Sequence, residues 1–84
     1  MKYTVDLSGP ARKQLKRLPK SQQKKLLDKI ESLSDNPRPF GYKKLIYYTD
    51  YFRVRVGNYR VIYTIEDTRL VVIVVEVTDR RDAY

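Results

Sequence analysis

Residues 51–65, with the sequence Tyr-Phe-Arg-Val-Arg-Val-Gly-Asn-Tyr-Arg-Val-Ile-Tyr-Thr-Ile, organise the second half of this 84-residue chain. Polar and apolar side chains alternate over 51–56, as they do on a strand with one buried face. Gly57-Asn58 is a tight-turn dipeptide, so the pattern predicts a hairpin between 51–56 and 59–65. Residues 70–77 are almost continuously Val and Ile, which predicts a central strand buried on both faces.

The first half of the chain predicts one strand and two helices. Residues 2–7 alternate and form the strand. Ser8 is a candidate N-cap for the first helix, with Pro10 near its first position, and Pro19 ends that helix. Ser21 is the candidate cap of the second helix. The apolar stripes of the two helices are Ala11, Leu15 and Leu18, and then Leu26, Leu27, Ile30 and Leu33.

These elements predict an α+β fold in the order β-α-α-β-β-β. The two helices form a hairpin that packs on one face of a mainly antiparallel four-stranded sheet, which gives two layers. The first strand lies at an edge of the sheet, and the face without helices carries arginines. A chain of 84 residues is too short for two domains, so residues 1–84 are expected to form one.

The composition excludes several kinds of chemistry. The chain has no Cys and no His, which removes disulfides, thiolate nucleophiles, histidine bases and zinc sites built from these residues. Catalysis must therefore come from Arg, Lys, Tyr and carboxylates, and no metal, cofactor or small-molecule ligand is expected. The apolar run at 70–75 is far shorter than the ~20 residues of a membrane helix, and no signal sequence is visible, so the prediction is a cytoplasmic protein with no membrane partner.

The positive charge is distributed unevenly. The net charge is +8, which indicates an acidic partner such as nucleic acid, an anionic membrane surface or an acidic protein. Residues 1–30 hold nine basic and two acidic side chains, whereas residues 31–84 hold nine and eight. The basic residues after position 45 are all arginines, which make fixed, forked contacts with phosphate or carboxylate.

Three of these arginines are predicted to share one face of the sheet. Arg53 and Arg55 alternate with apolar residues, and a turn at Gly57-Asn58 brings Arg60 close to Arg55. Close like charges repel by about 1 kcal/mol per pair even in water, so the arrangement suits a bound anion. The alternative is a solvated face whose arginines pair with carboxylates. The carboxylates considered for that pairing are Asp50, Glu66 and Glu76.

Tyrosines accompany the arginines. The chain has eight, and aromatic rings beside arginines hold single-stranded RNA by stacking on bases. The alternative is structural, because tyrosine is common in strands. Tyr84 differs from the others because it follows Arg80-Arg81 at the end of the chain. The lysines of the two helices also have a structural alternative as an ordinary solvated helix face.

Three segments together resemble the RelE/ParE toxin superfamily. They are residues 37–45 (Pro-Arg-Pro-Phe-Gly-Tyr-Lys-Lys-Leu), 51–63, and 71–84 with its terminal Arg-Arg-Asp-Ala-Tyr. The resemblance covers nearly the whole chain. It implies a toxin of a type II toxin–antitoxin module with a RelE-like microbial RNase fold. RelE-like members enter the ribosomal A site and cleave mRNA without a metal, by attack of the 2′-OH on the adjacent phosphate.

The resemblance also implies the site residues. Arg53, Arg55, Arg60, Arg80 and Tyr84 align with the basic and tyrosine catalytic positions of such members. Arg60 and Arg80 are expected to contact the scissile phosphate, and Tyr84 to orient the nucleotide. Because arginine is always protonated, the base must be another group, and the candidates are Asp79, Tyr84 and the terminal carboxylate. Further RNA contacts are expected from Lys13, Lys16, Lys43, Lys44 and Arg81.

Two other functions stay open at this point. One is a ParE-like toxin, which inhibits DNA gyrase and is not a nuclease. The other is a basic RNA-binding domain without catalysis, which predicts salt-dependent binding and no cleavage. The retained arginines and tyrosine favour the RNase. The expected partners are an acidic antitoxin protein, mRNA and the ribosome.

Overall fold

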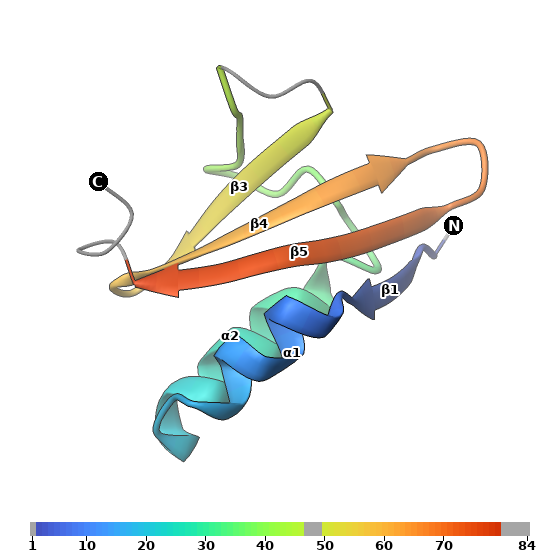
Figure 1. The fold of residues 1–84 in the computed structure, drawn as a ribbon. Coiled ribbons are helices and arrows are strands. Elements are labelled where there is room, and N and C mark those ends of the chain that lie inside the picture. The colour runs from blue at the N-terminus through green and yellow to red at the C-terminus, as the bar shows by residue number, and fades with distance from the viewer. Residues whose placement is uncertain (1, 47–49, 80–84) are drawn as a thin grey trace.

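The protein is a two-layer α+β structure in which two helices lie beneath one face of a twisted sheet (Figure 1). The computed structural model describes residues 2–46 and 50–79. In chain order the elements are β1 (Thr4–Leu7), α1 (Gly9–Lys16), α2 (Lys20–Ser32), β2 (Lys43–Lys44), β3 (Tyr51–Val56), β4 (Tyr59–Glu66) and β5 (Val71–Asp79). The strand order is β1-β5-β4-β3-β2, with β1 parallel to β5 and every other pair antiparallel.

The predicted fold class, element order and edge position of the first strand are confirmed, but the predicted number of strands is wrong. The sheet has five strands, because Lys43–Lys44 pairs with β3 as a short edge strand. Two residues are too few to show a period of two, so the sequence carries no signal for this strand. The hairpin of β3 and β4 turns at Gly57-Asn58 as predicted, with Gly57 at a φ of +58°.

The start of each helix differs in its cap. Ser8 caps α1 as predicted, because its hydroxyl oxygen accepts the Ala11 N–H at 3.2 Å. The predicted cap at Ser21 is wrong. The α2 helix begins two residues earlier than that cap implies, at Lys20, and Pro19 occupies the cap position without a side-chain hydrogen bond. Pro19 has an extended backbone (φ −56°, ψ 147°), as a capping residue has, and the helix begins directly after it.

The core lies between the helices and the inner face of the sheet. Its buried members are Ala11, Leu15, Leu26, Ile30, Leu33, Val54, Val61, Tyr63, Val72, Val74 and Val77. The prediction that β5 is buried on both faces is wrong, because Ile73 is 38% exposed. The described helices cover only one face of the sheet, so the Val/Ile run of β5 reflects its internal position in the sheet and not burial on both sides.

Two contacts fasten the loop that connects α2 to β2. The buried Tyr63 hydroxyl donates to the Pro37 carbonyl at 2.7 Å. Arg38 donates twice to the Asp67 carboxylate, at 3.2 and 2.8 Å, and the Tyr3 hydroxyl donates to the same carboxylate at 2.6 Å. Tyr3, Arg38 and Asp67, the Asp67 cluster, therefore join the N-terminal segment, the loop and the β4–β5 turn.

Candidate nucleic-acid interface

The face of the sheet that the described helices leave uncovered, the open face, gathers basic side chains at one end. Residues directly opposite one another in an antiparallel pair project to the same face. Lys43 lies opposite Arg53, and Arg55 lies opposite Arg60. Between these positions Val54 points into the core and is 2% exposed. The four cations therefore share the open face, as the sequence predicted for the three arginines.

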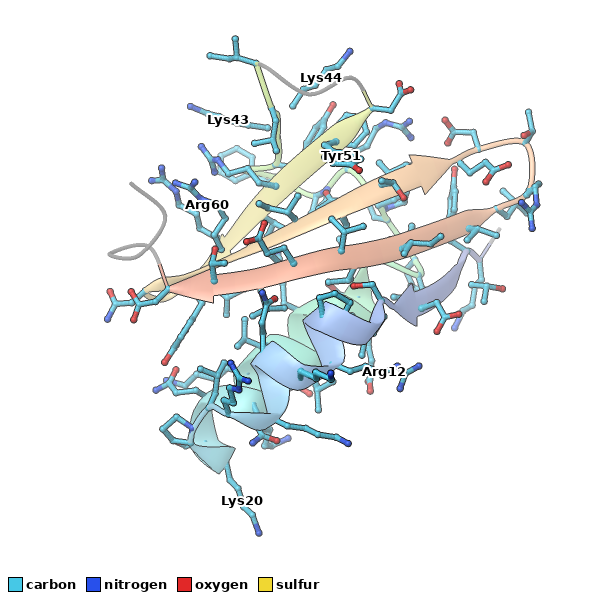
Figure 2. All side chains as sticks on the ribbon, viewed as in Figure 1. Arg12, Lys20, Lys43, Lys44, Tyr51 and Arg60 are labelled. Atoms are coloured by element: carbon cyan, nitrogen blue, oxygen red, sulfur yellow. The ribbon has the colours of Figure 1, made fainter. Side chains whose placement is uncertain are left out.

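Figure 2 shows Lys43 and Arg60 on the side of the sheet away from the helices, whereas Arg12 and Lys20 lie on the helical layer. The four cations of the open face come from β2, β3 and β4, which are neighbours in the sheet. The tight turn at Gly57-Asn58 sets the register that brings Arg60 opposite Arg55. A slip of one residue would move these side chains to the core face.

The arginines differ in burial. Arg60 is only 8% exposed, Arg53 is half-buried and Arg55 is exposed. A guanidinium stays protonated at any physiological pH, so Arg60 is a fixed charge in a largely water-excluded position. Electrostatic attraction is stronger there than in bulk water, so a phosphate that reached this position would be held more firmly than at the surface.

Two of the carboxylates considered as partners for these arginines, Glu66 and Glu76, lie at different places in the sheet. Glu66 pairs with Arg69 at 3.5 Å, at the opposite end of β4 from Arg60. Glu76 lies opposite Ile62 on the open face. Arg55 and Arg60 face each other directly across the hairpin, which concentrates positive charge at this position of the open face.

Thr78 is a member of this site that the sequence did not predict. It lies opposite Arg60 in β5, and its hydroxyl oxygen is buried without a hydrogen-bond partner among the described residues. A buried hydroxyl ordinarily has a hydrogen-bond partner. The Thr78 hydroxyl therefore adds a polar group that a ligand beside Arg60 could bind. The only sequence signal was a polar residue near the end of a Val/Ile run, which is typical of any strand end.

Asp79, the predicted alternative base, lies away from the arginines. It is opposite Tyr59, and alternation along β5 turns its side chain toward the helices, on the other side of the sheet from Arg60. It lines a groove of about 320 Å³ together with Gln14, Arg17 and Tyr59.

Two of the predicted RNA contacts, Lys13 and Lys16, are exposed on α1 and belong to the helical layer. Lys44 lies opposite Phe52, one residue out of phase with Lys43, so the two lysines project to opposite sides of β2. The remaining predicted site residues lie outside the described residues: Arg80, Arg81 and Tyr84.

Two other kinds of feature are absent from the described part of the chain. Residues 2–46 and 50–79 contain no group of three or more Asp or Glu side chains arranged to hold a metal ion. None of the helices in the same residues has the length and apolar character needed to cross a bilayer.

Solved structures share this architecture. The RelE chain of the archaeal RelE–RelB complex from Pyrococcus horikoshii is 31% identical with a TM-score of 0.84, and the match covers 99% of this chain and 100% of that one. The toxin–antitoxin complex RelBE2 from Mycobacterium tuberculosis contains a chain that is 30% identical with a TM-score of 0.86, with 98% and 95% covered. The fold is therefore that of a RelE-like toxin of the RelE/ParE superfamily.

Comparison of the sequence with known families and proteins gives the same assignment. The chain belongs to the family described as the ParE toxin of type II toxin–antitoxin systems, whose sequence model matches residues 5–84. It is also 36% identical to RelE1 of Methanocaldococcus jannaschii, over 100% of this chain and 97% of that protein. The resemblance stated from the sequence is thus confirmed, and the protein is a toxin of a type II toxin–antitoxin module.

Proposed function

We propose that this toxin is a ribosome-dependent endoribonuclease that cleaves mRNA in the A site. The observation that carries the proposal is the Arg55–Arg60 pair, flanked on the open face by Arg53 and Lys43. Four cations on one exposed face fit the phosphates of a nucleic-acid strand better than they fit an apolar protein surface. The fold that this chain shares with RelE relatives also supports this function.

The proposed reaction is a transfer of the phosphoryl group within the mRNA strand. The 2′-oxygen of one nucleotide attacks the adjacent phosphorus, a 2′-O–P bond forms and the P–O5′ bond breaks. The products are a 2′,3′-cyclic phosphate and a 5′-OH, with one proton leaving the 2′-OH and one reaching the 5′-oxygen. Arg60 and Arg80 stabilise the extra negative charge of the phosphorane-like transition state, which is the largest contribution that fixed cations can make.

The proton acceptor in this reaction is not an arginine. Arginine does not release its proton, so Arg53 and Arg55 bind and stabilise charge but do not act as bases. Asp79, Tyr84 and the terminal carboxylate are the candidates. The register of β5 turns Asp79 away from Arg60, which weakens its case. Tyr84 is also proposed to orient the nucleotide by stacking on its base or contacting the 2′-OH.

The proposed partners follow from the charge. RelE toxins of Pyrococcus horikoshii and Mycobacterium tuberculosis were solved in complexes with antitoxins. For this chain, with its net charge of +8, we infer an acidic antitoxin that neutralises the toxin, and mRNA and ribosomal RNA as the nucleic-acid partners. Lys13 and Lys16 supply a second basic surface on the helical layer.

A second candidate function rests on the family description. The matched family is named for ParE, so inhibition of DNA gyrase without RNase activity is the competing proposal. A non-enzymatic RNA-binding domain is the third. The gyrase function predicts DNA breaks in growing cells and intact mRNA, whereas plain RNA binding predicts neither breaks nor cleavage.

The test compares arginine variants on ribosomes stalled with mRNA. Replacing Arg55 or Arg60 by Ala should slow cleavage by roughly 100-fold or more, the typical loss when one charge-stabilising donor is removed. The matched control is Arg69→Ala, which removes an exposed arginine that pairs with Glu66 at the far end of β4 and should leave the rate unchanged.

Because Arg60 is buried, its variants need a check on folding. Arg60→Lys keeps the positive charge, and circular dichroism with urea unfolding reports whether each variant is folded. Cleavage at the wild-type rate by a folded Arg60→Ala protein would remove Arg60 from the catalytic site. Recovery of part of the rate in Arg60→Lys is the expected signature of a charge effect.

A further inference from the structure

The loop between α2 and β2 carries a phenylalanine, Phe40, whose ring is fully exposed to solvent. Phe40 is 104% exposed, so its ring makes almost no contact with the rest of the described protein. Large aromatic side chains are usually covered on folding, and a fully exposed one is a candidate contact for a partner. The loop around Phe40 is anchored on both sides and lies next to basic residues, which indicates the kind of partner.

The chain before Phe40 is anchored at two successive residues. The Pro37 carbonyl accepts the hydroxyl of buried Tyr63 at 2.7 Å. Arg38 then makes a two-pronged contact with the Asp67 carboxylate, at 3.2 and 2.8 Å. Such forked pairs restrict orientation as well as distance, so the loop leaves the body of the protein in one direction.

The chain after Phe40 is anchored as well. The Tyr42 N–H donates to the Pro39 carbonyl at 3.0 Å, which closes a four-residue turn. Gly41, the third residue of that turn, has a φ of +92°, as a type II turn requires. The Tyr42 ring then packs against Phe52 with centroids 6.0 Å apart. A closed turn with both ends fixed therefore presents Phe40 to solvent by its geometry.

The charge next to this turn is positive. Two exposed lysines, Lys43 and Lys44, follow the turn, and Lys43 lies opposite Arg53 on the open face. Figure 2 shows both lysines at the β2 edge of the sheet, away from the helical layer. An aromatic ring next to cations is the combination that binds single-stranded nucleic acid, since the ring stacks on a base while the cations hold phosphates.

We propose that Phe40 stacks on an unpaired RNA base outside the cleaved bond, while Lys43 binds the adjoining phosphate. The choice of RNA as partner rests on the proposed function, but the contact itself does not require cleavage. Phe40 is then a binding residue that extends the interface from the arginines to the β2 edge. Pro37 and Arg38 act only by positioning the turn.

The first test uses a tryptophan at position 40 as a fluorescent reporter. The chain contains no tryptophan, so Phe40→Trp introduces a single indole at the turn. The matched control is Ile46→Trp, because Ile46 is also highly exposed, at 89%, and follows β2. The probes are a single-stranded oligoribonucleotide of about ten bases, which fits common site sizes, and mRNA-programmed ribosomes.

Stacking should quench the indole emission of the Phe40→Trp protein on saturation with the oligoribonucleotide and leave that of the Ile46→Trp protein nearly unchanged. Co-sedimentation with ribosomes measures binding independently of fluorescence. Unchanged emission from Phe40→Trp protein that co-sediments overturns the proposal, as does the absence of binding to both probes. Adding Arg60→Ala to Phe40→Trp should slow cleavage by roughly 100-fold or more and keep the quenching, so failure of the catalytic proposal remains distinguishable from failure of this one.

The second test separates stacking from a general apolar contact. Phe40→Ala and Phe40→Leu should each weaken ribosome binding by roughly 10-fold, within the range for loss of one stacked base, whereas Phe40→Tyr should bind normally. The loss should appear in KM and not in kcat. Full affinity in Phe40→Leu overturns stacking. Normal RNA binding by Phe40→Ala with weakened binding to the acidic antitoxin assigns the ring to a protein partner and overturns the proposal.

Discussion

Arg60 combines burial with a position opposite another arginine, and the sequence predicted only the second of these properties. Alternation placed Arg53 and Arg55 on one face, and the turn dipeptide fixed the register that sets Arg60 opposite Arg55. Burial depends on which strand lies on the other side of β4. That strand is β5, with Thr78 opposite Arg60, and local periodicity does not show which residues of the two strands lie opposite each other.

The Tyr63 side chain links the sheet to the loop between α2 and β2. Its hydroxyl donates to the Pro37 carbonyl inside the core, so Tyr63→Phe leaves that carbonyl without its donor. The free energy of unfolding should fall by about 1 kcal/mol, the usual net contribution of such a hydrogen bond. Urea unfolding at neutral pH measures the change. The control is Tyr59→Phe, at a half-buried ring near the end of the hairpin, which should change stability little.

The same residue predicts the behaviour at high pH. Burial raises the pKa of Tyr63 to about 12, whereas an unfolded tyrosine ionises near its usual value of 10.0. The raised pKa stabilises the fold fully below pH 10 and loses this effect as pH rises through 12. Wild-type protein should therefore lose more stability than Tyr63→Phe between pH 10 and 12. Parallel losses in the two proteins would contradict this cause.

Helix starts and strands are predicted correctly from the sequence where a single contact between residues close in the chain forms them. The Ser8 cap of α1 is such a case, because the donor and the acceptor lie within one turn of chain. The same kind of prediction is wrong at Ser21, because the cap of α2 is Pro19 and Ser21 lies inside the helix. The edge strand β2 was missed because its two residues are defined by pairing with β3 and not by their own pattern.

The two serines form a matched test. Ser8→Ala removes the hydroxyl that accepts the Ala11 N–H and also donates to the Val75 carbonyl at 3.1 Å. The free energy of unfolding should fall by about 1 kcal/mol, as for other serine caps. Ser21→Ala lies inside α2 with an exposed side chain and should change stability by less than about 0.5 kcal/mol. Thermal or urea unfolding distinguishes the two, and an equal loss in both would restore Ser21 as a cap.

At the scale of the whole molecule, the fold separates two basic surfaces that the sequence described only as two charge sets. The sheet lies between the arginines of the open face and the lysines of the helical layer (Figure 2). The separation follows from packing, because the apolar stripes of the helices must cover one face of the sheet. The Asp67 cluster then joins segments from three parts of the chain, which no local pattern predicts.

The Asp67 cluster predicts a loss of stability in acid. Hydrogen bonds from Arg38, and then from Tyr3, lower the pKa of Asp67 from 3.8 to about 2. A lowered pKa stabilises the fold above the unfolded value and loses this effect as pH falls through about 2. The stability gap between wild type and Asp67→Asn should be constant above about pH 5 and close by about pH 2. Asp50→Asn, at an exposed turn position, is the control and should show no such gap.

Mapping of the mRNA ends after purified toxin is added to ribosomes stalled on a defined message tests directly whether this toxin is a ribosome-dependent RNase. Ribosome-dependent cleavage predicts one cut within the A-site codon, a 2′,3′-cyclic phosphate on the upstream fragment and a 5′-OH on the downstream fragment, with no cut in the absence of ribosomes. Intact mRNA at toxin levels that arrest growth, together with gyrase-dependent DNA breaks, would contradict it.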